Sequence, residues 1–246
     1  MSLLFPEWTN TLPKVVGAVG ALATVSVVAG VTYYFTPKFW EVGYEPVQPV
    51  SYSHKIHVQQ LGIDCRYCHS HVEESPHANI PDTQTCMNCH TGDVATSTSY
   101  LNSRLWESHK DNANLIKVRS AAASGEPIEW RRVHKLPDYV YFNHSAHVNT
   151  GISCVSCHGR VDTFAIVRQE HSLSMSWCLS CHRAPENHLV PLTEDDPSVA
   201  PAEMLKVTDL ERISRLIASP DQKDRGLGIA ESRKIEPPQN CGACHY

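Results

Sequence analysis

The chain has 246 residues, which is enough for one or two domains. Its formal net charge of −5 gives no electrostatic basis for binding nucleic acid. The informative number is ten cysteines, which would suggest disulfides in a short secreted chain and zinc in a cytosolic one. The spacing of the cysteines argues against both alternatives.

The first predicted element is an apolar segment near the amino terminus. Residues 15–35 carry no charged side chain, and a helix of that length crosses a bilayer. Trp8, Tyr33 and Tyr34 lie near its ends, where interfacial aromatic residues are common. The segment is longer than the apolar region of a signal peptide and ends without a small-residue cleavage pattern. We therefore expect an uncleaved transmembrane helix over residues 15–36.

Every cysteine belongs to a C-x-x-C-H string, and no thiol is left over. On one helical turn the two thiols and the histidine share a face, so the thiols can bond the two haem vinyl groups while the imidazole ligates the iron. Zinc ribbons do not need a histidine after each pair, and a thioredoxin motif would occur once beside a βαβ pattern. We predict five covalent c-type haems and call the strings first to fifth in chain order. The thioether residues are Cys65, Cys68, Cys86, Cys89, Cys154, Cys157, Cys178, Cys181, Cys241 and Cys244, and the proximal iron ligands are His69, His90, His158, His182 and His245.

The strings form two pairs, at residues 50–92 and 140–184, and the fifth lies at 241–245. An aromatic-x-H-x-x-H pattern precedes the first string of each pair, which indicates an internal repeat. The two imidazoles of H-x-x-H project from adjacent positions on one helical face, so they can reach two different irons. The predicted distal ligands are therefore His54, His57, His144 and His147.

The fifth distal ligand is left open by the repeat. Met175 lies three residues before Cys178, and a thioether ligand would give one His/Met haem with a raised potential. The alternative is a core methionine. His134 is a weaker candidate for the same role, and the remaining histidines can also be ordinary surface residues.

The rest of the chain predicts short helices. Thr208 and Glu211 fit a capping box at the start of a helix over residues 208–217, and apolar residues recur there at helical spacing. Proline, asparagine, aspartate, serine and glycine interrupt the chain elsewhere. We expect a mainly α protein with long loops and little sheet, in which haems form most of the core of one domain on a single amino-terminal transmembrane helix.

Five stretches together resemble a known family of cytochromes. The aromatic-x-H-x-x-H pattern resembles the class III (c3/c7-like) multihaem cytochromes. The full set is more similar to the membrane-anchored pentahaem cytochrome c subunits of bacterial alternative complex III, a quinol:electron-acceptor oxidoreductase. The stretches are Gln48–His54, Leu61–His69, Ile80–His90, Arg132–His144 and Met175–Arg183.

The resemblance implies ligand assignments. In c3-like proteins the first histidine of the pair ligates the haem of the string that follows, and the second serves another haem. His54 would then serve the haem on Cys65 and Cys68, and His144 the haem on Cys154 and Cys157. His57 and His147 would serve neighbouring haems.

The resemblance also implies partners and a location. Such a subunit relays electrons without bond-making catalysis, beside an iron–sulfur, molybdopterin-enzyme-like subunit, quinol-binding membrane subunits and a monohaem cytochrome c. Electrons leave towards a terminal oxidase or a small carrier. Because c-type haems are attached outside the bacterial plasma membrane, residues 1–14 would be cytoplasmic and residues 37–246 would form the extracytoplasmic haem domain.

Two other functions compete with this one. A stand-alone membrane-anchored quinol dehydrogenase of the tetrahaem type often has a methionine two residues after an attachment histidine, and none of the five strings does. A multihaem reductase, for example of nitrite, needs an iron with an open coordination position. The abundance of candidate sixth ligands argues against a reductase.

Overall fold

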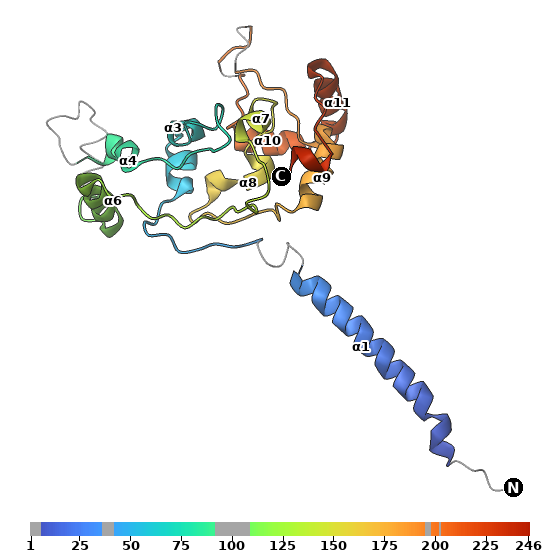
Figure 1. Ribbon diagram of the computed structural model, residues 1–246. Helices are drawn as coiled ribbons and strands as arrows, with labels where there is room; N and C mark the ends of the chain where they lie inside the picture. The colour runs from blue at the N-terminus through green and yellow to red at the C-terminus, as the bar shows by residue number, and fades with distance from the viewer. Residues whose placement is uncertain (1–5, 36–41, 92–108, 195–197, 202) are drawn as a thin grey trace. The chain divides into compact units, whose positions relative to one another are not determined.

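The computed structural model divides the chain into two units, Met1–Val42 and Gly43–Tyr246 (Figure 1). The structure describes residues 6–35, 42–91, 109–194, 198–201 and 203–246. Within these ranges it is mainly helical and contains no sheet, so the predicted fold class is confirmed. Positions 36 and 92, which end the predicted span 15–36 and the first repeat 50–92, lie outside the described residues.

The amino-terminal unit is a single long helix with a short 3-10 turn before it. The turn η1 covers Glu7–Asn10 and helix α1 covers Leu12–Phe35. The most apolar 18 residues within Trp8–Phe35 have a mean hydropathy of 2.1, and no residue of α1 is buried. At about 1.5 Å per residue a helix of this length exceeds the roughly 30 Å hydrocarbon core of a bilayer. Helix α1 is thus a candidate membrane anchor.

Short helices joined by loops make up the second unit. They are the π-helix η2 (Lys55–Gln60), the 3-10 turns η3 (Val161–Thr163), η4 (Pro185–Asn187) and η5 (Cys241–Ala243), and the α-helices α3 (Cys65–Cys68), α4 (Thr83–His90), α6 (Ala113–Ser124), α7 (His144–Val148), α8 (Val155–His158), α9 (Met175–Arg183), α10 (Leu210–Ile217) and α11 (Gln222–Arg233). Each C-x-x-C-H string lies in or at the end of one such turn. In Figure 1 the string-bearing helices follow one another from left to right as α4, α3, α8 and α9.

Side-chain caps start most of these string-bearing turns. Asp64, Asp82 and Asn240 each accept a backbone N–H of the turn that follows, at 2.9, 2.8 and 2.9 Å, and Ser174 does so for α9 at 3.4 Å. Such caps satisfy amide groups that have no partner inside a helix. A helix of one or two turns can therefore form where its thiols and imidazole are needed.

A small apolar core holds the third string. Val155 of α8 packs with Val190, Leu205, Leu210 and Ile213, all of which are buried. The neighbouring Ser153 is also buried, and its hydroxyl donates to the carbonyl of Val207 at 2.5 Å. Hydrophobic packing and one buried hydrogen bond therefore fix the start of this string.

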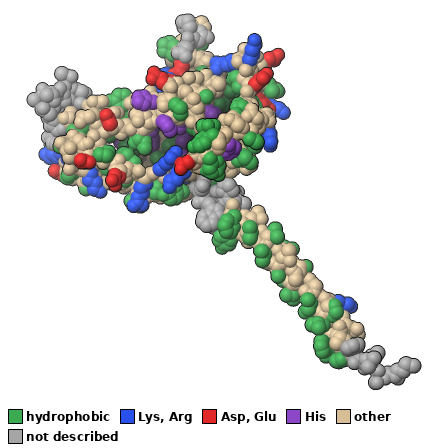
Figure 2. All heavy atoms as spheres, in the orientation of Figure 1, with side chains coloured by type: hydrophobic (Ala, Val, Ile, Leu, Met, Phe, Trp, Pro, Cys, Tyr) green, Lys and Arg blue, Asp and Glu red, His purple; other side chains and the backbone are tan. Residues whose placement is uncertain are grey.

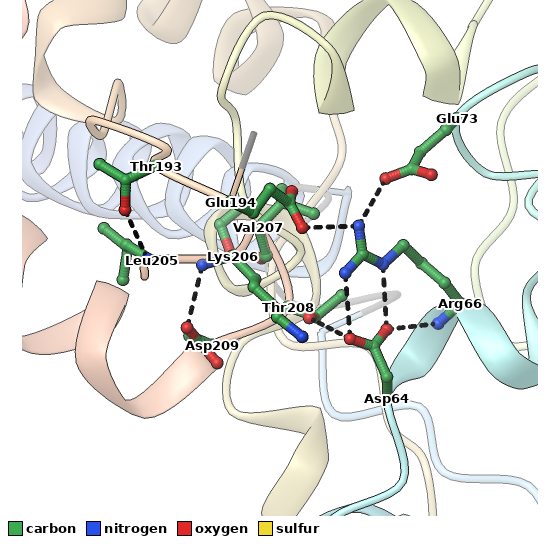
Figure 3. Close-up of polar contacts among 11 residues, drawn as sticks. Asp64, Arg66, Glu73, Thr193, Glu194, Leu205, Lys206, Val207, Thr208 and Asp209 are labelled. Carbon is green, nitrogen blue, oxygen red and sulfur yellow. Dashed lines mark hydrogen bonds and ion pairs between the residues drawn. The ribbon is translucent and has the colours of Figure 1, made fainter. Parts of the chain in front are cut away.

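An ion-pair network holds the first string instead (Figure 3). The Arg66 guanidinium contacts Asp64 at 3.1 Å, Glu73 at 2.9 Å and Glu194 at 2.8 Å. Thr208 donates its hydroxyl to Asp64 at 3.0 Å. Residues 64–73 and residues 194–208, which are far apart in sequence, thus meet in this network.

The same network corrects one sequence prediction. Helix α10 begins at Leu210 with Asp209 as its N-cap residue, so the predicted helix over residues 208–217 starts two residues too early. The predicted capping box is also wrong, because the Thr208 hydroxyl bonds Asp64 rather than an amide of its own helix. A carboxylate brought by the tertiary structure competes successfully with the local cap.

Candidate haem-binding sites

The two aromatic-x-H-x-x-H segments build the same arrangement of rings. In the first segment Tyr52 stacks on His57 at 4.4 Å between ring centroids and meets His54 edge-on at 4.9 Å. In the second segment Phe142 stacks on the second histidine at 4.8 Å and meets the first edge-on at 4.7 Å. The aromatic residue of the motif therefore separates and orients the two imidazoles, a role that the sequence pattern did not reveal.

Each of these four histidines faces the histidine of a different string. The ring centroids lie 6.5 Å apart for His54 and His69, 6.1 Å for His57 and His90, 6.5 Å for His144 and His158, and 6.2 Å for His147 and His182. A metal ion bonds an imidazole nitrogen at about 2 Å, so two imidazoles on opposite sides of one ion have ring centres about 6 Å apart. The spacing thus suits one metal ion between the members of each pair.

The angle between the facing rings differs between the pairs. His54 is nearly parallel to His69, at 3°, and His144 is nearly parallel to His158, at 6°. The planes of the other two pairs are inclined, by 65° for His57 and His90 and by 43° for His147 and His182. The first histidine of each repeat therefore makes a parallel pair and the second an inclined pair.

Backbone carbonyls fix the tautomer of most of these rings. The Nδ1 atoms of His57, His69, His144, His147 and His182 lie 2.6–2.9 Å from carbonyl oxygens of Ser53, Asn79, Pro76, Asn143 and Pro238. A carbonyl only accepts, so Nδ1 carries the proton and the Nε2 lone pair is free for a metal. No sequence signal could have identified these acceptors, because every residue offers a carbonyl.

Burial keeps several of the rings neutral. Desolvation, followed by the nearby charges of His134 and His144, lowers the pKa of His158 to about 3. Desolvation and then His69 lower the pKa of His54 to about 4. Because a protonated imidazole cannot ligate a metal, these shifts favour the ligating form at neutral pH. Figure 2 shows histidine side chains gathered on one hollowed face of the second unit.

The attachment thiols lie close to one another in a definite sequence of strings. Cys65 of the first string neighbours Cys154 of the third, and each thiol shifts the pKa of the other. Cys68 of the first string interacts electrostatically with Cys86 of the second. Cys157 of the third string interacts electrostatically with the thiols of the fourth string. Cys178 of the fourth string does so with Cys244 of the fifth. The neighbour order of the strings is therefore second, first, third, fourth, fifth.

The fifth string has a different environment. Its histidine, His245, lies 5.7 Å from the Tyr139 ring and makes a β-bridge with Val140. Met175 begins α9 one turn before Cys178 and is 66% exposed, so core packing does not account for this methionine. Met175 and Cys178 lie on the same face of α9, because they are three residues apart. The thiol of Cys178 neighbours Cys244 of the fifth string.

His134, the weaker candidate for a distal ligand, contacts the Nδ1 atom of His158 and does not form a facing pair with it. The His134 Nε2 atom is 3.3 Å from the His158 Nδ1 atom, and the ring planes are inclined by 89°. Three of the unassigned histidines, His71, His77 and His109, are exposed. Another, His171, stacks on Trp177 at 5.5 Å.

The donor set fits haem c better than zinc or disulfides. All ten cysteines are free thiols. Among the described residues, which include every string, no group of three or more His, Cys, Asp or Glu side chains is arranged to hold a metal ion by itself. Paired imidazoles with free thiols one turn away instead match a porphyrin-bound iron, with the thiols as thioether sites and the histidines as axial ligands.

Comparison with known proteins points to the same chemistry. Residues 50–114 match the family described as cytochrome c7 and related cytochrome c. The chain is 35% identical over 111 residues to the multihaem cytochrome c subunit of a menaquinone reductase from Nitratidesulfovibrio vulgaris. That alignment spans 45% of this chain and 45% of the relative, so it covers under half of either protein. The chain is accordingly similar to multihaem c-type cytochromes that transfer electrons, and haem c is the cofactor that this similarity implies.

Proposed function

We propose that this chain is the pentahaem electron-transfer subunit of a bacterial membrane quinol:electron-acceptor oxidoreductase of the alternative complex III type. The observation that carries the proposal is the set of four facing histidine pairs, each of which includes the histidine of a different C-x-x-C-H string. Haem c, when bound, supplies an iron that gains and loses one electron. Filled axial positions leave no place for a substrate, so relay is favoured over catalysis.

The facing pairs support a specific distribution of the distal ligands. In this proposal His54 and His57 serve the first and second strings, and His144 and His147 serve the third and fourth. Each H-x-x-H segment then clamps two neighbouring cofactors together. His69, His90, His158 and His182 complete the four bis-histidine sites, and His245 is the proximal ligand of the fifth.

Met175 is the proposed distal ligand for the fifth site. The other four sites each have two imidazoles, and the thiol of Cys178, one turn after Met175, neighbours Cys244. A thioether in place of an imidazole raises the potential of a haem. The fifth site would then hold electrons most tightly, which suits a position at one end of the relay.

The neighbour order of the thiols supports a single route through the protein. Electrons would pass between the second, first, third, fourth and fifth sites, or in the reverse direction. The contact between Cys65 and Cys154 is the junction between the two repeats in this route. No covalent bond of the chain is made or broken in such a relay.

Helix α1 supports a membrane location for the complex. We propose that it spans the bacterial plasma membrane with residues 1–14 in the cytoplasm and residues 37–246 on the extracytoplasmic side, where c-type haems are attached. The proposed partners are an iron–sulfur, molybdopterin-enzyme-like subunit, quinol-binding membrane subunits and a monohaem cytochrome c. The acceptor would be a terminal oxidase or a small carrier.

Purification in mild detergent tests this proposal. We expect five haems per chain by pyridine haemochrome assay, only low-spin ferric signals, and the partner subunits in the same complex. A chain that purifies alone and oxidises quinol would instead be a stand-alone dehydrogenase. A high-spin haem that binds cyanide or nitric oxide would support the multihaem reductase.

The relative's name raises the question of the direction in which electrons move between quinone and the haems. That relative is a subunit of a menaquinone reductase, in which quinone is the acceptor. Incubation of the purified complex with a quinol and, separately, with a quinone after chemical reduction would distinguish the two directions. Haem reduction by quinol supports our proposal, whereas reoxidation by quinone alone supports a quinone reductase.

A further inference from the structure

His158 differs from two other proximal histidines, His69 and His182, in what its Nδ1 atom contacts. His69 and His182 bond backbone carbonyls, at 2.6 and 2.7 Å. The Nδ1 atom of His158 faces the side chain of His134 instead, with Nε2 at 3.3 Å. A side-chain acceptor can be changed by mutation and a carbonyl cannot, so this site has an adjustable second contact.

The chemistry of the two rings fixes the direction of the hydrogen bond. If Nε2 of His158 ligates iron, its Nδ1 atom carries the proton and donates it. His134 Nε2 must then be the acceptor, which requires a neutral His134 ring with its own proton on Nδ1.

The position of His134 also separates it from the iron-binding edge of His158. His144 faces His158 in a parallel orientation at 6.5 Å, which is the arrangement of an axial pair. His134 instead approaches at right angles, with its ring centroid 4.3 Å away. The guanidinium of Arg132 donates to the His134 carbonyl at 3.0 Å and so restrains this segment.

We propose that His134 is a positioning residue that orients the His158 imidazole and increases its electron donation to the iron. This inference rests on the proposed ligation of iron by His158. A hydrogen bond to an acceptor raises the basicity of a ligating imidazole, which favours ferric over ferrous iron and lowers the potential. Because its only lone pair accepts from His158, His134 would also be excluded as the distal ligand of the fifth site.

Two variants of the full chain, purified with its haems, test the role. His134→Leu removes the acceptor and leaves a buried N–H without a partner, whereas His134→Gln keeps an oxygen that can accept. His71→Leu is the matched control, because His71 is exposed. The readouts are a redox titration that resolves the separate haems and the ferric EPR spectrum.

We expect His134→Leu to raise the midpoint potential of one haem and to change one low-spin EPR signal, with all haems retained. His134→Gln should restore most of the wild-type potential, and His71→Leu should resemble wild type throughout. Unchanged potentials and spectra in His134→Leu would overturn the proposal. Conversion of one haem to a high-spin form in both His134 variants would also overturn it, because His134 would then be an iron ligand. A wild-type protein without haem would instead contradict the proposed function itself.

Discussion

The two repeats place the same ligands by different physical means. In both, an aromatic ring separates the two histidines of H-x-x-H, and the facing rings lie 6.1–6.5 Å apart. The string after the first segment is held by the ion pairs of Arg66, and the Arg66 side chain is 25% exposed. The string after the second segment is held by buried Val155 and its apolar neighbours.

This contrast shows which parts of a covalent cofactor site are constrained. The ligand geometry is reproduced closely because an iron tolerates little variation in the positions of its axial nitrogens. The support around each site is free to differ, because two thioether bonds would hold the cofactor whatever packs beside it. Changes to ligands should therefore have similar effects in the two repeats, and changes to their support should have different ones.

Loss of a distal ligand should have the largest effect. We expect His54→Ala and His144→Ala each to convert one haem from a low-spin to a high-spin or water-ligated form, since each opens one axial position. Ferric EPR and the optical spectrum measure the change, with exposed His71→Ala as the control. If either variant kept all its low-spin signals, that histidine would be removed from the set of ligands.

A cavity in the apolar core should have the second-largest effect, which is a loss of stability. Ile213 is fully buried against Val155, so Ile213→Ala should lower the free energy of unfolding by about 2–5 kcal/mol. Guanidinium unfolding, followed by circular dichroism, measures this free energy. Leu227→Ala is the control, because Leu227 is partly exposed. Equal losses in the two variants would argue that the core does not support the third string.

Loss of the arginine network should have a smaller effect on the first repeat. Arg66→Met removes charged hydrogen bonds to Asp64, Glu73 and Glu194, and we expect a loss of about 1.5–3 kcal/mol. The same unfolding assay applies. Arg215→Met, which removes an exposed ion pair with Glu211, should change stability little. If Arg66→Met were as mild as this control, the network would not be the support of the first string.

The sequence was most informative where chemistry imposes a local pattern. The spacing of C-x-x-C-H and H-x-x-H predicted helical turns with the residues on shared faces, and helices occupy those positions. The helix at 208–217 was predicted less well, because Asp64, which caps the first string some 140 residues earlier, bonds Thr208. Local patterns contain no information about such a competitor.

The partner of the second histidine in each repeat and the order of the strings were also beyond the sequence. Nothing in the pattern specifies that His57 faces His90 or that Cys65 meets Cys154, because these contacts depend on how loops fold back. The same holds for His134, which the sequence suggested as a distal ligand but whose contact is with His158. A histidine count identifies candidate ligands, whereas the tertiary structure supplies their neighbours.

The aromatic residue of each repeat gives the smallest expected effect. Tyr52→Leu and Phe142→Leu remove the ring that stacks on the second histidine, a contact worth about 0.5–1.5 kcal/mol beyond burial. The inclination between His57 and His90 should then change in the first variant, and that between His147 and His182 in the second. Ferric EPR detects this, because the anisotropy of a low-spin signal depends on the angle between the axial rings. Each variant should alter one inclined pair and leave the parallel pair of the other repeat unchanged. An effect confined to protein stability, with identical spectra, would show that the aromatic ring fills space and does not orient the ligand.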